Sequence, residues 1–341
     1  MIDLAIRTLV EGSHLTRDEM REVVAEMMDG ATSDIQKSAF LVALRMKGET
    51  PEEITGAAMA MRERLTPLDV DQDRVIDTCG TGGDGKGTFN VSTVAALVAA
   101  GAGAIVAKHG NRAVSSSCGS ADLLAALGVD IELDARQASV VLRRVGIAFL
   151  FAPKLHPAMG AVAAVRRQLG IRTIFNLLGP LINPAQARRQ VMGVYAPALV
   201  PVLADVLLAL GAEHAIVVHS NDGLDEISIS APTLLCEVLD GAVRCYELAP
   251  EDAGLSRHPL EALKGGGAVE NAAIATAILE GAPGAPRDIV LLNAAAALHV
   301  AGISRSIREG VDAARASIDS GSARRKLDEL IAASREAGAT A

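Results

Sequence analysis

A glycine-rich segment decides how this sequence is interpreted: residues 75–90 read VIDTCGTGGDGKGTFN. Residues 75–79 are mostly apolar or β-branched, which predicts a short buried strand. The glycines that follow predict a tight turn, and a helix is expected to begin near Asn90. This order of strand, glycine loop and helix brings backbone N–H groups and the positive end of a helix dipole to one point, which is typical of an anion-binding site.

Two nucleotide-binding motifs overlap this loop, and neither is complete. A G-x-G-x-x-G match begins at Gly80, but a dinucleotide site also needs an acidic residue at the end of the next strand, where this sequence has Lys108. A G-x-x-x-x-G-K match begins at the same glycine, but Gly87 occupies the position of the Ser or Thr that binds magnesium in a P-loop. A turn without a ligand is the remaining alternative, and Asp84 among four glycines argues against it.

A second polar segment, KHGNRAVSSSCGSAD at residues 108–122, follows the next expected strand at residues 104–107. Its two cations, amide and hydroxyl groups suit a multiply charged phosphate ester. Because open α/β sheets bind ligands outside the carboxyl ends of their strands, both loops should face one crevice. Ser120 is also a good N-cap for a helix expected near residues 121–127, which would be a purely structural role.

The rest of the chain predicts an α/β fold: a small all-helical domain plus a large domain with a mainly parallel sheet flanked by helices. Capping boxes predict helices within residues 1–70, and they are Thr16 with Glu19, Ser33 with Gln36, and Thr50 with Glu53, with Pro51 at a first helical position. Further strands are expected at residues 147–151, 191–194, 215–219, 227–229, 234–239 and 243–246. The alanine-rich sequence from about residue 269 onward predicts three or four helices.

Composition limits the classes of function. A net charge of -9 and an aromatic content of 2% oppose a general nucleic-acid binder, which needs a basic face and often stacks bases on aromatic rings. The apolar stretches are short or interrupted, so we expect no membrane span, and with no signal-peptide pattern we expect a cytoplasmic location. Cys79, Cys118, Cys236 and Cys245 show no CxxC or metal-ligand spacing, and reduced thiols are expected.

Several segments resemble, in order and spacing, the signature sequences of the anthranilate phosphoribosyltransferases, which have a nucleoside phosphorylase-like fold. They are DTCGTGGD (77–84), KHGNR (108–112), GSAD (119–122), FAP (151–153), HPAM (156–159), RTIFNLLGPL (172–181), NP (183–184), GLDEIS (223–228) and ENA (270–272). The resemblance covers nearly the whole chain. Cys118, Ala125 and Gly267 depart from residues common in the family, at positions with no assigned chemistry.

The resemblance implies transfer of a 5-phosphoribosyl group from 5-phosphoribosyl-1-diphosphate to the amine of anthranilate, with release of pyrophosphate, as a step of tryptophan biosynthesis. It implies Mg²⁺ as the cofactor, held by Asp225 and Glu226 with the hydroxyl of Ser92. The phosphoribosyl diphosphate is expected at Gly80, Gly83, Asp84, Thr88, Asn90, Val91, Ser92, Thr93, Lys108, His109, Gly110, Asn111, Arg112, Ala113, Val114, Ser115, Ser116 and Ser120.

Anthranilate is expected near Gly80, Asn111 and Arg166, since a guanidinium fork suits a planar carboxylate. His109 is the candidate general base. An aromatic amine is already neutral at pH 7, however, so its lone pair needs no strong base and a role of His109 in shaping the site is favoured. Stabilisation of the leaving pyrophosphate is expected to carry most of the catalysis.

The resemblance also implies two domains and a homodimer. Residues 1–72 with about 165–190 are expected to form the small helical domain, for dimerisation and anthranilate; residues 73–164 with 191–341 are expected to form the large domain, for phosphoribosyl diphosphate and magnesium. One alternative is a pyrimidine nucleoside phosphorylase of the same fold, which is not expected to carry Asp225–Glu226. Another is a non-catalytic paralogue that binds nucleic acid, which should show lost carboxylates and a basic surface.

Overall fold

Four helices form the amino-terminal part of the protein in the computed structural model, which describes residues 1–113 and 117–339. They are α1 (Ile2–Val10), α2 (Arg17–Met28), α3 (Asp34–Lys47) and α4 (Pro51–Arg62). The three predicted capping boxes, Thr16–Glu19, Ser33–Gln36 and Thr50–Glu53, are confirmed. In each, the N-cap hydroxyl and the side chain three residues later accept each other's backbone N–H, which satisfies donors that a helix start leaves unpaired.

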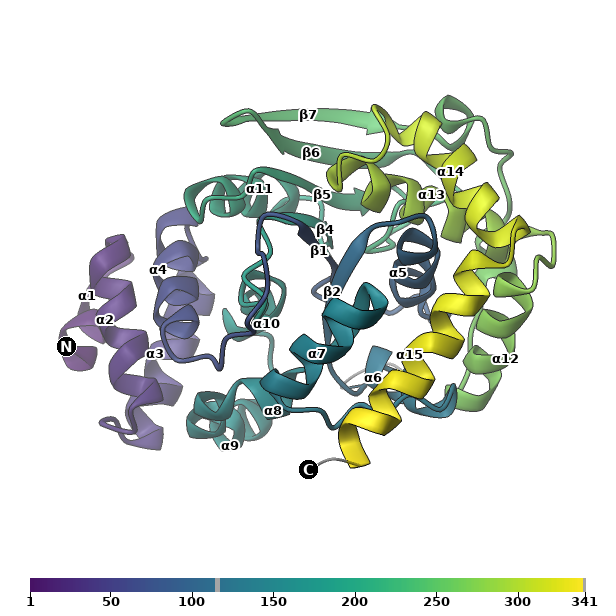
Figure 1. The fold of residues 1–341 in the computed structure, drawn as a ribbon. Coiled ribbons are helices and arrows are strands. Elements are labelled where there is room, and N and C mark those ends of the chain that lie inside the picture. The colour runs from purple at the N-terminus through teal and green to yellow at the C-terminus, as the bar shows by residue number, and fades with distance from the viewer. Residues whose placement is uncertain (114–116, 340–341) are drawn as a thin grey trace.

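Within the described residues, seven strands form one sheet in the order β3-β2-β1-β4-β5-β6-β7 (Figure 1). They are β1 (Val75–Thr78), β2 (Ile105–Gly110), β3 (Ile147–Phe151), β4 (Arg189–Gly193), β5 (His214–Ser220), β6 (Thr233–Leu239) and β7 (Ala242–Leu248). The first five are parallel, and β6 and β7 extend the sheet in antiparallel pairs. The mainly parallel sheet predicted from the sequence is confirmed. The strand expected at residues 227–229 is wrong, because the Ile227 N–H there bonds to the side chain of Asn293 instead of to a neighbouring strand.

β2 continues beyond its predicted end. Lys108, His109 and Gly110 were expected in a loop, but they pair with β3 in parallel register, as far as Gly110 opposite Phe151. The sequence misled at this point because the side chains are polar, whereas the backbone hydrogen bonds of a central strand do not depend on side-chain polarity. Since successive side chains of a strand point to opposite faces, Lys108 and His109 are directed to different sides of the sheet.

Helices cover both faces of the sheet. One layer consists of α5 (Val91–Gly101), α6 (Ser120–Ala126), α7 (Ala135–Val145), α12 (Ala268–Leu279), α13 (Ala285–Val300), α14 (Ile307–Asp319) and α15 (Ser322–Ala339). The other consists of α11 (Leu199–Ala209) with α1–α4, α9 (Gly160–Leu169) and α10 (Phe175–Leu178). The strands alternate between the layers: Val191 and Ile216 belong to the first buried cluster, and the next residues, Met192 and Val217, to the second.

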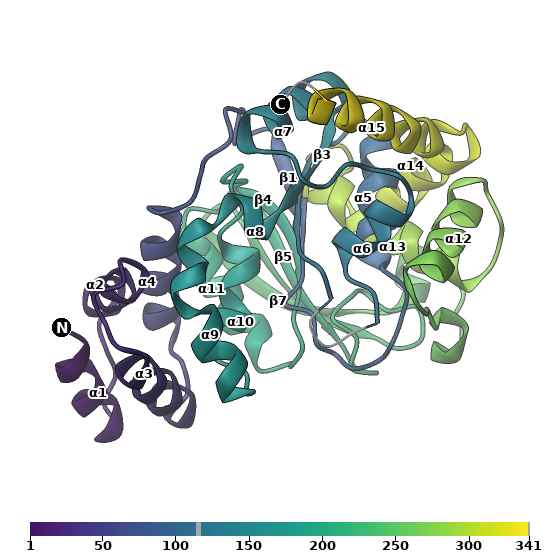
Figure 2. The ribbon, with the colours of Figure 1, turned by 90° about the horizontal axis from the view of Figure 1, so that it is seen from below.

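In both ribbon views, α1–α4 and the carboxyl-terminal helices α12, α14 and α15 lie at opposite ends of the molecule (Figures 1 and 2). The four helices α12–α15 confirm the helical carboxyl-terminal region predicted from its alanine content. Short elements complete the chain: α8 (Ala152–Leu155) and the 3₁₀ turns η1 (Pro157–Met159), η2 (Gly179–Leu181), η3 (Pro250–Ala253) and η4 (Leu260–Leu263). No helix among the described residues is both long and apolar enough to cross a membrane.

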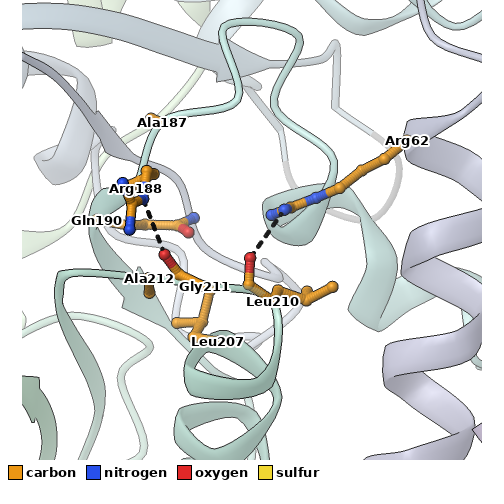
Figure 3. A pocket seen from close by; sticks show the side chains of 8 residues that line it. All are labelled: Arg62, Ala187, Arg188, Gln190, Leu207, Leu210, Gly211 and Ala212. Atoms are coloured by element: carbon orange, nitrogen blue, oxygen red, sulfur yellow. Dashed lines mark hydrogen bonds between the residues drawn. The ribbon is translucent and has the colours of Figure 1, made fainter. Parts of the chain in front are cut away.

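A small hollow lies where α4 meets the end of α11 (Figure 3). Arg62 donates to the carbonyl oxygens of Leu181 and Leu210, at 2.8 and 3.4 Å, and Arg188 donates to that of Gly211 at 3.0 Å. Burial lowers the pKa of Arg62 to about 10. The hollow holds about 10 Å³, which is room for one water molecule at most, so its arginines tie helix ends together and do not form a substrate site.

One expectation about the cysteines is wrong. Cys236 on β6 and Cys245 on β7 are direct partners in the antiparallel register and form a disulfide, with a Cα–Cα distance of 4.0 Å. The reason is the hairpin, which places the two residues opposite each other although their sequence spacing matches no known motif. Neither Cys79 nor Cys118 is part of a disulfide.

Candidate active site

The candidate site lies where the strand order reverses. β1 is flanked by β2 on one side and by β4 on the other, so the chain leaves this point in two directions, which is where open α/β sheets bind ligands at the carboxyl ends of their strands. The Thr81 N–H donates to the Gly193 carbonyl at 2.8 Å, which joins the loop after β1 to the end of β4. A Cβ on Gly80 would lie 3.1 Å from that carbonyl oxygen and 3.2 Å from Asp225 Oδ2. Glycine at this position therefore lets three loops converge.

The glycine loop has the backbone conformation that its composition predicts. Gly82, Gly83, Gly85 and Gly87 all have positive φ, between 65° and 81°, which side chains rarely adopt. The loop turns Asp84 inward. Its Oδ1 accepts the Lys86 N–H at 3.1 Å, and its Oδ2 is buried without a hydrogen-bond partner. A buried carboxylate oxygen without a donor is costly, and it favours a cation as its missing partner.

Two further carboxylates meet Asp84. Asp225 and Glu226 lie in the loop after β5, and the Ser92 N–H at the start of α5 donates to Glu226 Oε1 at 3.0 Å. Burial, and then repulsion by Asp84, raises the pKa of Asp225 well above its usual range. Burial, and then repulsion by Asp225, raises the pKa of Glu226 in the same way. These three half-buried carboxylates lie close enough to repel one another and offer oxygen ligands of the kind that Mg²⁺ prefers, so a bound cation would relieve their repulsion.

Lys108 on β2 brings a positive charge close to Glu226. Its side chain is buried, and its ammonium group donates to the Thr78 carbonyl at 2.6 Å, at the end of β1. Its charge lowers the pKa of both Asp77 and Glu226, against the effect of their burial. Burial still raises the pKa of Asp77 to about 6, although Asn183 Nδ2 donates to this carboxylate at 2.7 Å. Lys108 thus places a buried positive charge beside the carboxylates of Asp77 and Glu226.

His109 belongs to a buried pair. Its Nδ1 lies 3.1 Å from the Gly179 carbonyl oxygen, and its Nε2 lies 3.1 Å from Nε2 of His156. Since a carbonyl only accepts, His109 Nδ1 carries the proton, and His109 Nε2 then accepts from His156. Burial lowers the pKa of His109 to about 3 and that of His156 to about 4, so both rings are neutral at pH 7. Both ring nitrogens of His109 are engaged, which favours a role in shape over base catalysis.

Asp122, which was not among the predicted site residues, organises the loop after β2. The Asp122 carboxylate accepts the N–H groups of Ala113 and Gly119, both at 2.9 Å, and pairs with the Arg112 guanidinium at 3.0 Å. Ser120 is the first residue of α6 and Gly119 is the N-cap, so the predicted capping role of Ser120 is wrong. Only glycine fits at position 119, because a Cβ there would lie 2.5 Å from the backbone carbonyl carbon of Arg112. Val114, Ser115 and Ser116, which were expected at the substrate, lie outside the described residues.

Asn90 and the neighbouring residues connect the two loops. Asn90 is the N-cap of α5, and its Nδ2 donates to the Cys118 carbonyl while its Oδ1 accepts from Asn271, each at 3.0 Å. The Thr93 hydroxyl is buried without a hydrogen-bond partner. Thr88 forms an isolated bridge with Lys264. These contacts place the glycine loop, the start of α5 and the second loop around one space.

Two arginines approach from the helical segment after β3. The Arg166 guanidinium lies over the Phe175 ring, 5.6 Å from its centroid, and burial lowers its pKa. Arg172 was not selected from the sequence, but its guanidinium donates to the Gly83 carbonyl and lies 4.0 Å from the centroid of the Tyr195 ring. Its position in the RTIFNLLGPL segment was the signal that could have identified it.

Comparisons with known proteins agree with this architecture. Residues 4–65 match the helical bundle domain of a glycosyl transferase family, and residues 72–324 match the a/b domain of a glycosyl transferase family. The anthranilate phosphoribosyltransferase of Anaeromyxobacter dehalogenans is 59% identical over 98% of each chain, and that of Symbiobacterium thermophilum is 55% identical over 95% of each. The crystal structure of the Thermus thermophilus enzyme is similar with a TM-score of 0.92, at 47% identity over 97% of this chain and 99% of the other.

The Saccharomyces cerevisiae anthranilate phosphoribosyltransferase in complex with PRPP and Mg has a TM-score of 0.90, at 30% identity over 98% of each chain. The helical bundle joined to a mainly parallel sheet covered on both faces matches the two domains of a glycosyl transferase family, so the chain is a transferase of glycosyl groups. Within that class, the high identity over nearly the full length is specific to one family. The chain belongs to the anthranilate phosphoribosyltransferase family.

Proposed function

We propose that this chain transfers the 5-phosphoribosyl group of 5-phosphoribosyl-1-diphosphate to the amine of anthranilate, a step of tryptophan biosynthesis. The observation that carries the proposal is the meeting of Asp84, Asp225 and Glu226 beside the start of α5. In the reaction, the amine nitrogen forms a bond to the anomeric carbon, the bond to the pyrophosphate oxygen breaks with its electron pair, and the amine releases one proton. Magnesium, when bound, stabilises the charge that develops on the pyrophosphate.

The residues of the chain supply position and charge around that bond change. Asp225 and Glu226, with the Ser92 hydroxyl, are proposed to hold magnesium, and Asp84 offers a third carboxylate whose Oδ2 has no other partner. The glycine loop and the segment after β2 are proposed to hold the phosphoribosyl diphosphate through their N–H groups, and the related Saccharomyces cerevisiae enzyme is known in complex with PRPP and Mg. The described members of the set predicted from the sequence lie on the glycine loop, the first turn of α5, the last residues of β2, the segment after β2 and the start of α6.

Anthranilate is proposed to bind near Gly80 and Asn111, with its carboxylate toward Arg166. The supporting observation is that Arg166 is largely buried with its guanidinium over an aromatic ring, and that no carboxylate of the described residues forms a salt bridge with it. A guanidinium held in this way can pair with an incoming carboxylate in two parallel hydrogen bonds. His109 is proposed to shape this wall and to leave the amine proton to solvent or to pyrophosphate, since its Nε2 is already bonded to His156.

The domain division is part of the proposal: residues 1–72 with about 165–190 as the small domain, and 73–164 with 191–341 as the large one. Side chains of α9 and α10 share one buried cluster with those of α1–α4, which supports placing residues about 165–190 with the amino-terminal helices; the cluster also includes α11 and residues of β4, β5 and β6, where the small domain meets the large one. A homodimer through the amino-terminal helices is also proposed, because Leu4, Val10, Ile35 and Met46 on α1 and α3 are 60–83% exposed. Light scattering on an Ile35→Glu, Met46→Glu variant would show a monomer if these faces form the contact, and an unchanged dimer would refute it.

A cytoplasmic location completes the proposal, because the substrates are anionic metabolites that do not cross membranes unaided. The Cys236–Cys245 pair offers a direct check, since disulfides are rare in reducing compartments. If the cytoplasm reduces the Cys236–Cys245 disulfide of the structure, alkylation at the moment of cell lysis should label four thiols per denatured chain. Only two labelled thiols would indicate that the pair is oxidised inside the cell.

The activity is tested by the loss of anthranilate fluorescence with phosphoribosyl diphosphate, with and without magnesium. We expect magnesium-dependent consumption that an Asp225→Ala, Glu226→Ala variant abolishes. The matched control is Asp312→Ala with Asp328→Ala, which removes two carboxylates that are 80% and 56% exposed on α14 and α15. Cleavage of uridine or thymidine in phosphate buffer, with anthranilate unchanged, would instead favour the nucleoside phosphorylase alternative.

A further inference from the structure

A cluster of two histidines and a glutamate lies at the end of the sheet opposite to the candidate active site. His214 is the first residue of β5, Glu237 is on β6, and His299 is near the end of α13. β5 runs from His214 to Ser220, so the cluster is roughly 20 Å from the loop that carries Asp225, at about 3.3 Å per residue. Its members come from three elements that are distant in sequence, and the fold brings their side chains together.

The three side chains present their ligand atoms to one point. Nε2 of His214 lies 2.8 Å from Glu237 Oε1, and Nε2 of His299 lies 3.1 Å from the same oxygen. One ligand atom from each of the three residues falls within 4.8 Å of the other two. The side chains of His214, Glu237 and His299 are 7%, 15% and 16% exposed, so the group is largely shielded from water and is still open on one side.

Hydrogen bonding fixes the protonation of His299. Its Nδ1 lies 3.1 Å from the Ser304 carbonyl oxygen, which can only accept, so Nδ1 carries a proton. In the neutral ring, Nε2 then holds a lone pair that faces the lone pairs of Glu237 Oε1. This arrangement is stable only if a cation lies between them: a second proton on His299, or a metal ion. A histidine that donates Nδ1–H to a backbone carbonyl and directs Nε2 to a shared point is typical of metal ligands.

We propose that His214, Glu237 and His299 form a binding site for one divalent transition-metal ion of the zinc type, separate from the magnesium site. Imidazole and carboxylate ligands suit Zn²⁺, which leaves a fourth position for water, whereas Mg²⁺ prefers oxygen ligands alone. Tetrahedral ligands at about 2.0–2.1 Å from zinc are roughly 3.3 Å apart. The two histidine-to-carboxylate distances of 2.8 and 3.1 Å therefore need to open by only a few tenths of an ångström.

Asp77, Cys79 and His109 form another cluster of possible metal ligands in the described chain, and the surroundings favour the proposed set over it. In that cluster both carboxylate oxygens of Asp77 already accept hydrogen bonds and the ammonium of Lys108 is close. In the proposed site, the second oxygen of Glu237 accepts only a long hydrogen bond of 3.3 Å from the Tyr246 hydroxyl, which orients the carboxylate.

Charged neighbours of the proposed site act in both directions. Arg244 is the cross-strand partner of Glu237, and Arg189 on β4 is the register partner of His214, while Glu309 contributes negative charge toward His299. The two arginines are partly or fully in contact with water, which screens their repulsion of a cation. The metal would join β5, β6 and α13, and would fasten the antiparallel extension of the sheet to a central helix.

The test is a titration of the full chain, stripped with a chelator, with Co²⁺ followed by visible absorption and then by competition with Zn²⁺. The Asp225→Asn, Glu226→Gln background removes binding at the magnesium site. We expect one Co²⁺ per chain, with bands of a nitrogen and oxygen site and without the near-ultraviolet charge transfer of a thiolate ligand. Absence of such a one-to-one complex in the unsubstituted site would overturn the proposal, whatever the behaviour of the variants.

The variants then assign the ligands. His299→Gln and Glu237→Gln should each weaken binding at least about tenfold and abolish the rise in Tm that Zn²⁺ gives, while His258→Gln, at a histidine whose side chain pairs with Asp288, should bind as before. Circular dichroism and transferase activity in the otherwise native chain check that each variant is folded, since none of these residues is placed at the substrate site. Unchanged Co²⁺ binding in folded His299→Gln protein would also refute the site.

Discussion

Replacing Gly193 by alanine is expected to displace the acidic loop without touching a charged group. A Cβ on Gly193 would overlap the Asp225 carbonyl oxygen and lie only 2.6 Å from the carbonyl carbon. Because ordinary contact begins near 3.4 Å, the contact with the carbonyl carbon alone requires a shift of about 0.8 Å, and the overlapping carbonyl oxygen requires a larger one. The methyl group meets backbone and not a flexible side chain, so local rotation cannot absorb it.

The displacement has a predictable cost. Misplacement by about 1 Å at a catalytic group can cost about 100-fold in rate, so we expect kcat/KM to fall by roughly 10- to 100-fold, or about 1.4–2.7 kcal/mol. Overpacking should lower the free energy of unfolding by about 1–3 kcal/mol. The assay is anthranilate consumption over a series of magnesium concentrations, where the concentration for half-maximal activity should rise at least tenfold.

A matched alanine identifies the cause. Gly160 has an ordinary φ, and a Cβ placed on it would have nothing within 4 Å, so Gly160→Ala adds the same methyl group in open space. This substitution should leave the magnesium dependence unchanged. Because residue 160 is the first of α9 and alanine favours helices, the change should not destabilise the helix. Gly193→Ala protein with native kcat/KM and native magnesium dependence would refute the argument that this close approach positions Asp225.

Three further predictions concern charge and packing. The pKa values of Asp225 and Glu226 are raised in the fold, so the metal-free protein keeps protons that the unfolded chain has lost, and its stability falls as pH rises from the acidic into the neutral range. Magnesium binds the ionised carboxylates, so calorimetry should show tighter binding at pH 8 than at pH 6. Equal affinities at the two pH values would contradict this prediction. Lys108→Met leaves the buried Asp77 without its nearby cation and should lower the free energy of unfolding by about 3–5 kcal/mol in urea, with Lys108→Arg as the charge-retaining comparison. Arg62→Met leaves two helix-end carbonyl groups without their donor and should cost about 1–3 kcal/mol in the same measurement, and a loss below a few tenths would show that water replaces the guanidinium.

The local rules of sequence predicted most of the elements correctly. The capping boxes at Thr16, Ser33 and Thr50 depend on contacts within four residues, so a sequence shows them directly. The glycine loop was predictable for the same reason, because positive φ values favour glycine. The length of β2 was not, since the pairing of Lys108 to Gly110 with β3 depends on a strand about 40 residues away.

The sequence predicted the carboxylates of the site but not the side chains that hold its loops in place. Asp225 and Glu226 came from a motif, whereas Arg172 and Asp122 act through backbone contacts that only the folded chain defines. The Cys236–Cys245 disulfide was missed because the register of a hairpin decides which residues face each other. In each case the missing information is a long-range pairing, which residue types alone do not encode.

The hydrogen bond between His109 and Gly179 has a consequence for how the two substrates influence each other. It joins the end of β2 to the turn that follows α10, so it connects the phosphoribosyl side of the crevice to the helical side. If anthranilate shifts that turn when it binds, the shift is transmitted to His109, whose backbone N–H donates a hydrogen bond to Asp77 Oδ1 at 3.2 Å. Thermodynamic linkage then requires the influence to be mutual: whichever substrate arrives first alters the affinity for the second by the same factor as in the reverse order.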